Sequence, residues 1–181
     1  MNKLFGITLL IAGLILAMSA GANFRYYEAD RSVTTAIVAD DNEFIDLTPL
    51  QPYAYLDNGK LTVELSASNQ NYNESLGFGQ GLSPNTTYVF EEVFAVSNEL
   101  WENNETDYPI CVAISVPANS EITLFTGEYD ESATYGTQLQ FTVEHGSPVA
   151  VGMIFDNYGL ELGTYEINSM TISAEAGACE T

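Results

Sequence analysis

Positively charged residues are scarce in this chain. Its 181 residues include four Lys and Arg against 25 Asp and Glu, which gives a formal net charge of −21 at pH 7. A surface this acidic repels phosphate backbones and anionic lipid headgroups, so we expect neither nucleic acid nor, after export, a membrane as a partner. Most of these carboxylates are expected to form a solvated acidic surface.

Residues suited to catalysis are also few. His145 is the only histidine, and it lies at an expected turn with Gly146, so an H-E-x-x-H zinc site is excluded. No G-x-S-x-G motif is present, and two cysteines with one histidine give little support for a thiol protease. The glycine-rich segment 77–81 lacks the Lys and the helix of a phosphate-binding loop. We therefore predict a protein that is not an enzyme and uses no cofactor.

Long apolar runs are absent except at the N-terminus. Lys3 precedes the apolar stretch Leu4–Met18, and Ala20-Gly21-Ala22 forms an A-x-A-type cleavage site. This pattern predicts a signal peptide over residues 1–22 and an extracellular or cell-surface protein that begins at Asn23. Retention of the run as an N-terminal membrane anchor is the alternative.

Convincing amphipathic helices are absent from the rest of the chain, where short alternating runs dominate. Ala54–Val63 places two such runs around Asn58-Gly59, the dipeptide of a tight type I′ hairpin turn. Val149–Phe155 is apolar on both faces, as expected of a central strand. The other expected strands are Thr87–Val96 (interrupted at Glu91-Glu92 as by a β-bulge), Pro109–Val116, Glu121–Phe125, Gln138–Glu144 and Ser169–Ala174.

Nine or ten short strands separated by turn signals predict an all-β fold. The expected architecture over residues 33–181 is a two-sheet β-sandwich with jelly-roll or Greek-key connections. Two polar segments, 67–86 and 97–107, lack periodicity and are expected as surface loops. Trp101 in the second loop is expected to anchor it over the core rather than to bind a ligand.

Three N-x-S/T sequons fall in these two loops, at Asn73, Asn85 and Asn104. Their placement in an exported chain makes them candidates for surface N-glycosylation.

The two cysteines are Cys111, in an expected strand, and Cys179, two residues from the C-terminus. An oxidising compartment permits a disulfide that pins the C-terminal tail to the sandwich. A buried thiol at Cys111 and an unrelated thiol in the tail are the alternative, because sequence spacing supplies no geometry.

Four carboxylates gather in one short region before the first expected hairpin. They are a weak candidate for a Ca²⁺ site, although their spacing does not match that of an EF-hand, and an ordinary acidic turn is the alternative. The residues are Asp40, Asp41, Glu43 and Asp46.

Residues 23–32 form an N-terminal arm that is unusual for this chain. The arm combines three aromatic residues with two of the four cations, and the β-branched segment Val33–Val38, of high strand propensity, follows it. Such an arm can pair with its own body as an edge strand or complete the sheet of a neighbour. In the second case its contact residues are Phe24, Tyr26 and Tyr27 as anchors, with Arg25 and Arg31 pairing with an acidic surface.

Three segments resemble an archaeal family of secreted proteins. Ala29–Pro49 (ADRSVTTAIVADDNEFIDLTP) is similar to that family's A-D-R-x-V-x-V-x-V-x-D-D-x-x-x-x-L-x-P opening. Asn85–Asn98 (NTTYVFEEVFAVSN) is similar to its N-x-x-x-x-F-x-x-V-F-x-V-x-N strand, and Val149–Ala174 resembles its closing V-x-V-G-x-x-x-D…G-x-x-x-x-x-x-I-x-A pattern. The family in turn resembles the TasA/camelysin group and the archaeal bundling pilins.

This resemblance implies a jelly-roll β-sandwich and assembly by donor-strand complementation, in which the N-terminal strand of each subunit completes a sheet of the next. The metalloprotease label carried by camelysin-like proteins is not transferred, because His145 is the only histidine.

The expected function is therefore structural. We predict a subunit of an extracellular filament, of the pilus or biofilm-matrix type, that binds copies of itself head to tail through the arm. The alternatives are a monomeric secreted or membrane-tethered surface domain in an envelope or adhesion role, for which glycans are candidate partners, and, with less support, a secreted hydrolase that uses the carboxylates and a metal.

Overall fold

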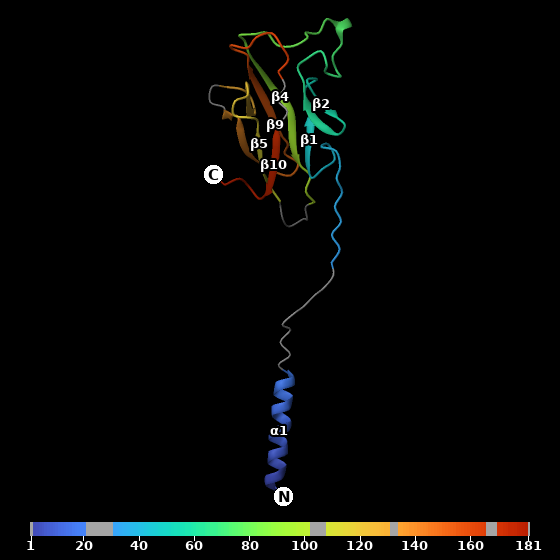
Figure 1. Ribbon diagram of the computed structural model, residues 1–181, viewed down its shortest axis with the longest axis vertical. Coiled ribbons are helices and arrows are strands. Elements are labelled where there is room, and N and C mark those ends of the chain that lie inside the picture. The colour runs from blue at the N-terminus through green and yellow to red at the C-terminus, as the bar shows by residue number, and fades with distance from the viewer. Residues whose placement is uncertain (1, 21–30, 102–107, 131–133, 166–169, 181) are drawn as a thin grey trace. The chain divides into compact units, whose positions relative to one another are not determined.

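The computed structural model describes residues 2–20, 31–101, 108–130, 134–165 and 170–180. The chain divides into two compact units, Met1–Ala36 and Ile37–Thr181 (Figure 1). In the first unit, helix α1 spans Asn2–Ala20 and contains the apolar run. Within the described part of the chain, no helix combines the length and apolarity needed to cross a membrane.

The second unit is built from strands. The described residues form ten of them and a single 3-10 turn, η1 (Glu74–Leu76), so the prediction of an all-β fold is confirmed. The strands are β1 (Ile45–Pro49), β2 (Ala54–Asp57), β3 (Lys60–Val63), β4 (Thr87–Asn98), β5 (Ile110–Ser115), β6 (Ile122–Thr126), β7 (Tyr135–Gly136), β8 (Gln138–Val143), β9 (Val149–Asp156) and β10 (Thr171–Ala176).

All strand pairs are antiparallel, and they form three sheets. The largest has the order β1-β4-β9-β6-β7, the second has the order β10-β5-β8, and β2 with β3 forms a hairpin. Between β4 and β10 the chain passes repeatedly from one of the two larger sheets to the other. The assignment of these connections to a jelly roll or a Greek key stays a prediction.

Side chains of both larger sheets meet in one hydrophobic core. Fully burying a Val, Leu, Ile or Phe side chain stabilises a fold by about 1.5–3 kcal/mol relative to leaving it exposed. Strand β10 is the exception in its sheet, because its apolar residues Ile172 and Ala174 are only partly buried. The core side chains with less than 2 % exposure are Val93, Phe94, Val96, Val112, Ile114, Leu124, Phe125, Val143 and Val151.

Three local predictions are confirmed. The hairpin pairs Asp57 with Lys60 around Asn58 and Gly59, whose φ angles of 49° and 80° suit a type I′ turn. The register of β4 against β9 shifts between Phe90 and Phe94, as expected for a β-bulge, and Glu92 there has a φ of 51°. Strand β9 lies between β4 and β6 and is therefore central.

One strand-prone segment forms no strand, and one local prediction is wrong. No strand is assigned to Val33–Val38, and the first strand among the described residues begins at Ile45. Trp101 does not anchor its loop over the core, because 85 % of its surface is exposed. Its ring instead packs edge-on against Phe44, with 5.4 Å between the ring centroids, and Phe44 is itself 52 % exposed.

Candidate assembly surface

The segment that directly follows the N-terminal arm exposes β-branched side chains that are assigned to no strand. Residues 31–39 have no assigned secondary structure, and Val33 and Ile37 are 88 % and 96 % exposed. Strand propensity is therefore present there, but no strand partner is found among the described residues. Of the predicted contact residues, the structure describes only Arg31, which is exposed; Phe24, Arg25, Tyr26 and Tyr27 lie outside the described residues.

A groove lined by both apolar and acidic side chains lies between two edge strands of the body. Its cavity has a volume of about 350 Å³ and is lined from three strands and from the segments that precede β1 and β10. We call it the β1/β10 groove. The lining residues are Asp40, Glu43, Ile45 and Leu47 on the β1 side, Leu61 of β3, and Met170, Ile172, Ser173 and Ala174 on the β10 side.

Asp40 fixes one side of this groove by bonding to two strands at once. Its backbone oxygen accepts a hydrogen bond from the amide of Leu47 in β1 at 2.7 Å, and its carboxylate accepts one from the amide of Leu61 in β3 at 2.7 Å. Its own amide donates to the oxygen of Gly59 in the hairpin turn at 2.9 Å. The outer edge of β1 is thereby already occupied at Leu47.

The β10 side of the groove is an open sheet edge. Among the described residues, β10 pairs only with β5, over all six positions from Thr171 opposite Ser115 to Ala176 opposite Ile110. An edge strand presents a row of N–H and C=O groups to any extended segment that lies beside it. The β10 edge can therefore accept one more strand.

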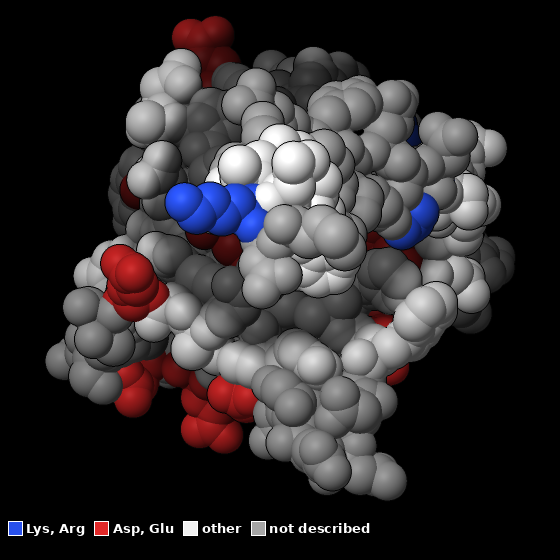
Figure 2. Space-filling model, turned by 90° about the horizontal axis from the view of Figure 1, so that it is seen from below, with Lys and Arg blue, Asp and Glu red and all other residues white. Residues whose placement is uncertain are grey.

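Negative charge is concentrated near the groove. Burial, followed by the charges of Asp40 and Asp46, raises the pKa of Glu43 above its usual value. Burial and the charges of Glu99 and Asp41 also raise the pKa of Asp46, against the opposing effect of its hydrogen bond from Thr48. On the face drawn in Figure 2, acidic side chains recur in several separate places while basic ones cover little of the surface.

The four carboxylates proposed for Ca²⁺ are not brought together as a metal site. Within the described ranges, no group of three His, Cys, Asp or Glu side chains is arranged to hold a metal ion. Asp41 accepts a hydrogen bond from the Asn42 amide group at 2.7 Å, and the Asp40 carboxylate is bound to the Leu61 amide. One carboxylate oxygen of Asp40 and one of Asp41 thus already accept hydrogen bonds from within the protein.

The two cysteines form a disulfide beside the groove. Cys111 of β5 is bonded to Cys179, with 4.7 Å between their Cα atoms. The backbone amide of Cys179 also donates to the hydroxyl of Thr142 in β8 at 2.9 Å. Because Cys179 follows β10 by three residues, the bridge fixes the C-terminal end of the strand that forms one wall of the groove.

The sequons and the histidine lie on the surface where they are described. Asn73 and Asn85 are exposed, and Asn104 is outside the described residues. The Asn73 side-chain oxygen accepts from the amide of Ser75 at 3.0 Å, and that of Asn85 accepts from the amide of Gly159 at 3.1 Å. His145 is exposed in the tight turn between Glu144 and Ser147, as predicted.

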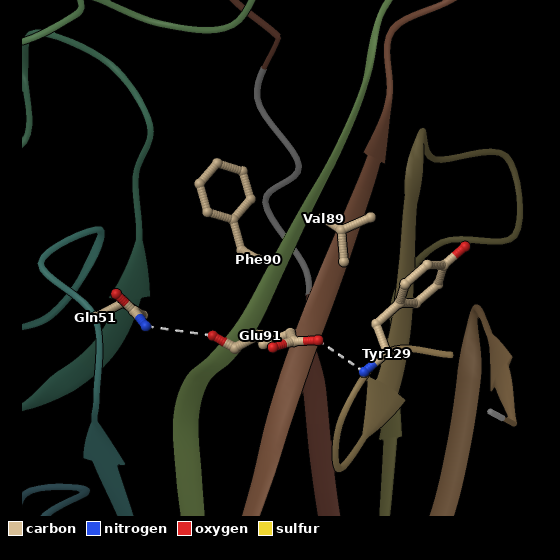
Figure 3. Close-up of a pocket in the computed structure, with 5 residues that line it drawn as sticks. All are labelled: Gln51, Val89, Phe90, Glu91 and Tyr129. Atoms are coloured by element: carbon tan, nitrogen blue, oxygen red, sulfur yellow. Dashed lines mark hydrogen bonds between the residues drawn. The ribbon is translucent and has the colours of Figure 1, made fainter. Parts of the chain in front are cut away.

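A second cavity, of about 440 Å³, lies over the bulged part of β4 (Figure 3). Two hydrogen bonds join its walls through Glu91. The Gln51 side chain donates to the Glu91 backbone oxygen at 3.4 Å, and the amide of Tyr129 donates to the Glu91 carboxylate at 2.9 Å. Val89 and Phe90 complete the lining. Among the described residues, Thr87–Phe90 of β4 pair with β9 but not with β1.

Sequence reasoning missed the β1/β10 groove altogether. Its walls come from segments that are more than 100 residues apart, Asp40–Leu61 and Met170–Ala174, so no local pattern brings them together. The only available signal was the run Ile172–Ala174 near the C-terminus, which was expected to form a strand but could not be placed in a sheet.

Comparison with known proteins identifies the family. A family described as "Protein of unknown function (DUF1102)" matches residues 37–179, and the chain belongs to it. The match begins at the residue where the second compact unit begins, so the matched region is the all-β body. Neither the curated proteins nor the solved structures contain a significant match to the chain.

Proposed function

We propose that this protein is a structural subunit of an extracellular filament, of the pilus or biofilm-matrix type, that polymerises through its N-terminal arm. The observation that carries the proposal is the exposure of Val33 and Ile37 in a strand-prone segment that is assigned to no strand. Among the described residues, the buried members of the core cluster lie between Leu47 and Met153.

The physics of strand addition supports this role. An extended segment on an open sheet edge gains main-chain hydrogen bonds and places alternate side chains in pockets. Ten residues at about 3.3 Å each span about 33 Å, which is enough to reach into a neighbouring subunit. A contact between an arm and a different part of the next copy is head to tail, so it propagates into a filament unless the rotation closes a ring.

Electron microscopy of two purified forms tests the proposal. The mature chain from Asn23 is expected to form filaments, whereas a chain from Ser32 is expected to give single particles of one size. A substituted mature chain, Phe24→Ser with Tyr26→Ser, should also stay monomeric because it lacks two anchors. The matched control, Glu28→Gln with Asp30→Asn, alters the arm at two other positions and should still polymerise.

Monomers from both forms would favour the alternative function, that of a surface domain which does not polymerise. If the mature chain and the chain from Ser32 are both monomeric at high concentration, with and without Ca²⁺, the filament role is lost. The protein would then be a secreted or membrane-tethered envelope domain, and its exposed aromatic pair Phe44 and Trp101 would be the first surface to examine for a ligand.

A further inference from the structure

We propose that the β1/β10 groove is the acceptor site for the N-terminal arm of a second copy, and that the arm pairs with the free edge of β10. This inference rests on the proposed function and adds the surface that receives the donor strand. The segment that binds there is residues 23–32 of a second copy of this chain.

The two larger sheets differ in a way that leaves room for one strand. The sheet containing β1 has five strands, while the sheet containing β10 has three. Strands β1 and β10 are each at the edge of their sheet, and they line the same cavity. A strand added beside β10 would extend the smaller sheet and lie over the apolar side chains of the β1 side.

Side-chain chemistry matches an arm that alternates in period two. The groove offers Ile45, Leu47 and Leu61 on one wall and Ile172 with Ala174 on the other. In an extended arm, alternate residues point to the same face, which puts Phe24 and Tyr26 together. Those two aromatic side chains would bury apolar surface that β10 leaves only partly covered.

Charge limits which part of the arm can enter the groove. Arg25 and Arg31 are balanced by Glu28 and Asp30, so the side-chain charges of the arm sum to zero. In an extended arm Glu28 and Asp30 share the face of Phe24 and Tyr26, and the two arginines lie on the opposite face. Because Asp40 and Glu43 line the groove, the aromatic end of the arm is the part that suits it.

Three other described sheet edges suit a donor strand less well. Strand β7 has two residues, Tyr135 and Gly136, and can offer only a short ladder. The edge of β1 is engaged at Leu47 by Asp40. Strand β8 is as long as β10, but neither cavity described above is lined by its residues.

Hydrogen exchange on the chain from Ser32 to Thr181 tests the site directly. This form retains the whole unit Ile37–Thr181, which contains all the described core residues. The probe is a synthetic peptide with the sequence of residues 23–32. We expect the peptide to slow amide exchange in Thr171–Ala176 at least tenfold, with no change in β7 or β8. The same protection of β10 is expected in filaments of the mature chain.

A matched pair of substitutions on β10 provides an independent test. Ala174→Arg fills the groove with a long charged side chain, so it should weaken peptide binding at least tenfold and stop the mature chain from polymerising. Ala176→Arg makes the same change at an exposed position that does not line the groove, and binding should stay within twofold. Thermal unfolding of both variants shows whether the body is intact.

The outcomes separate this inference from the proposed function. Filaments that persist in Ala174→Arg, or peptide binding that protects β7 or β8 instead of β10, would overturn the groove assignment and leave the filament intact. A mature chain that is monomeric with β10 protected would show that the arm fills its own groove, which overturns the second-copy occupant. Absence of both filaments and peptide binding overturns both proposals.

Discussion

Cys111 and Cys179 are joined across the end of the sheet edge that we assign as the acceptor. Cys111 pairs in register with Glu175 of β10, and Cys179 follows that strand by three residues. The disulfide therefore closes a loop of chain that begins in β5 and returns past β10, with a sequence separation of 68. The edge strand is held at its C-terminal end by a covalent bond.

Removing this disulfide should destabilise the body. We expect the double substitution Cys111→Ser with Cys179→Ser to lower the free energy of unfolding by about 2–4 kcal/mol, because the bridge restricts the unfolded chain. Urea unfolding of the variant, compared with the parent chain with and without reductant, measures the loss. Exchange in Thr171–Ala176 should accelerate more than exchange in β9. A variant as stable as the parent would mean that the bridge contributes nothing to holding β10.

The close approach of Phe125 and Gly152 provides a second prediction. These residues are in register on β6 and β9, and a Cβ atom added at Gly152 would overlap the Phe125 ring, which is fully buried. Gly152→Ala should therefore cost about 1–3 kcal/mol, the usual range for overpacking a core. Gly79→Ala is the control, because nothing lies near its Cα. Equal melting temperatures for the two variants would show that the ring can move aside.

Local sequence signals predicted the elements that local chemistry determines. The Asn58-Gly59 turn follows from residues that tolerate positive φ, and the interruption at Glu91-Glu92 predicted the bulge in β4. The apolar run Val149–Phe155 predicted a central strand because both of its faces are covered. In each case the information lies within ten residues.

The failures have a common physical origin in long-range context. Val33–Val38 has the composition of a strand, but a strand needs a partner, and propensity does not supply one. Trp101 packs on Phe44 at the surface because the core is complete without it. The β1/β10 groove depends on distant segments coming together, which spacing along the chain does not reveal. For the same reason the sequence left the disulfide between Cys111 and Cys179 open beside the alternative of two free thiols, and the structure contains the disulfide.

Asn98 is a buried polar residue whose hydrogen bonds hold three segments together. Its amide group donates to the backbone oxygens of Tyr108 at 2.8 Å and Val143 at 3.1 Å, and its oxygen accepts from the amide of Leu100 at 3.1 Å. Its side chain is fully buried at the end of β4, so each bond replaces one that water would otherwise make.

Asn98→Asp should be strongly destabilising at pH 7. A carboxylate cannot donate to the two carbonyl oxygens and would be charged in a dry site, so we expect a loss of about 3 kcal/mol or more. The loss should shrink in acid, where a protonated carboxyl regains one donor. Urea unfolding at pH 7 and pH 4 measures both effects. Asn119→Asp, at an exposed position, should change stability by no more than about 0.5 kcal/mol.

Asp46 makes stability depend on pH in a predictable direction. Its Oδ1 atom is buried and has no hydrogen-bond partner among the described residues, and burial is the main cause that raises its pKa in the folded protein. Because the folded pKa is above the unfolded value, the folded chain binds the proton more tightly. This carboxyl group's contribution to stability is therefore present at low pH and is lost as the pH rises through the folded pKa.

Asp46→Asn should abolish the loss of stability that the ionisation of Asp46 causes as the pH rises. At pH 7 we expect the variant to be more stable than the parent by up to about 1 kcal/mol, since the charge is partly solvated and its repulsion by Glu99 and Asp41 disappears. At pH 3 the two proteins should unfold at nearly the same temperature. Melting curves taken between pH 3 and pH 8 measure the difference, with Glu128→Gln, an exposed carboxylate after β6, as the control. If the melting temperature of the parent instead rises above that of Asp46→Asn as the pH increases, a cation or a further hydrogen-bond donor must satisfy the buried oxygen.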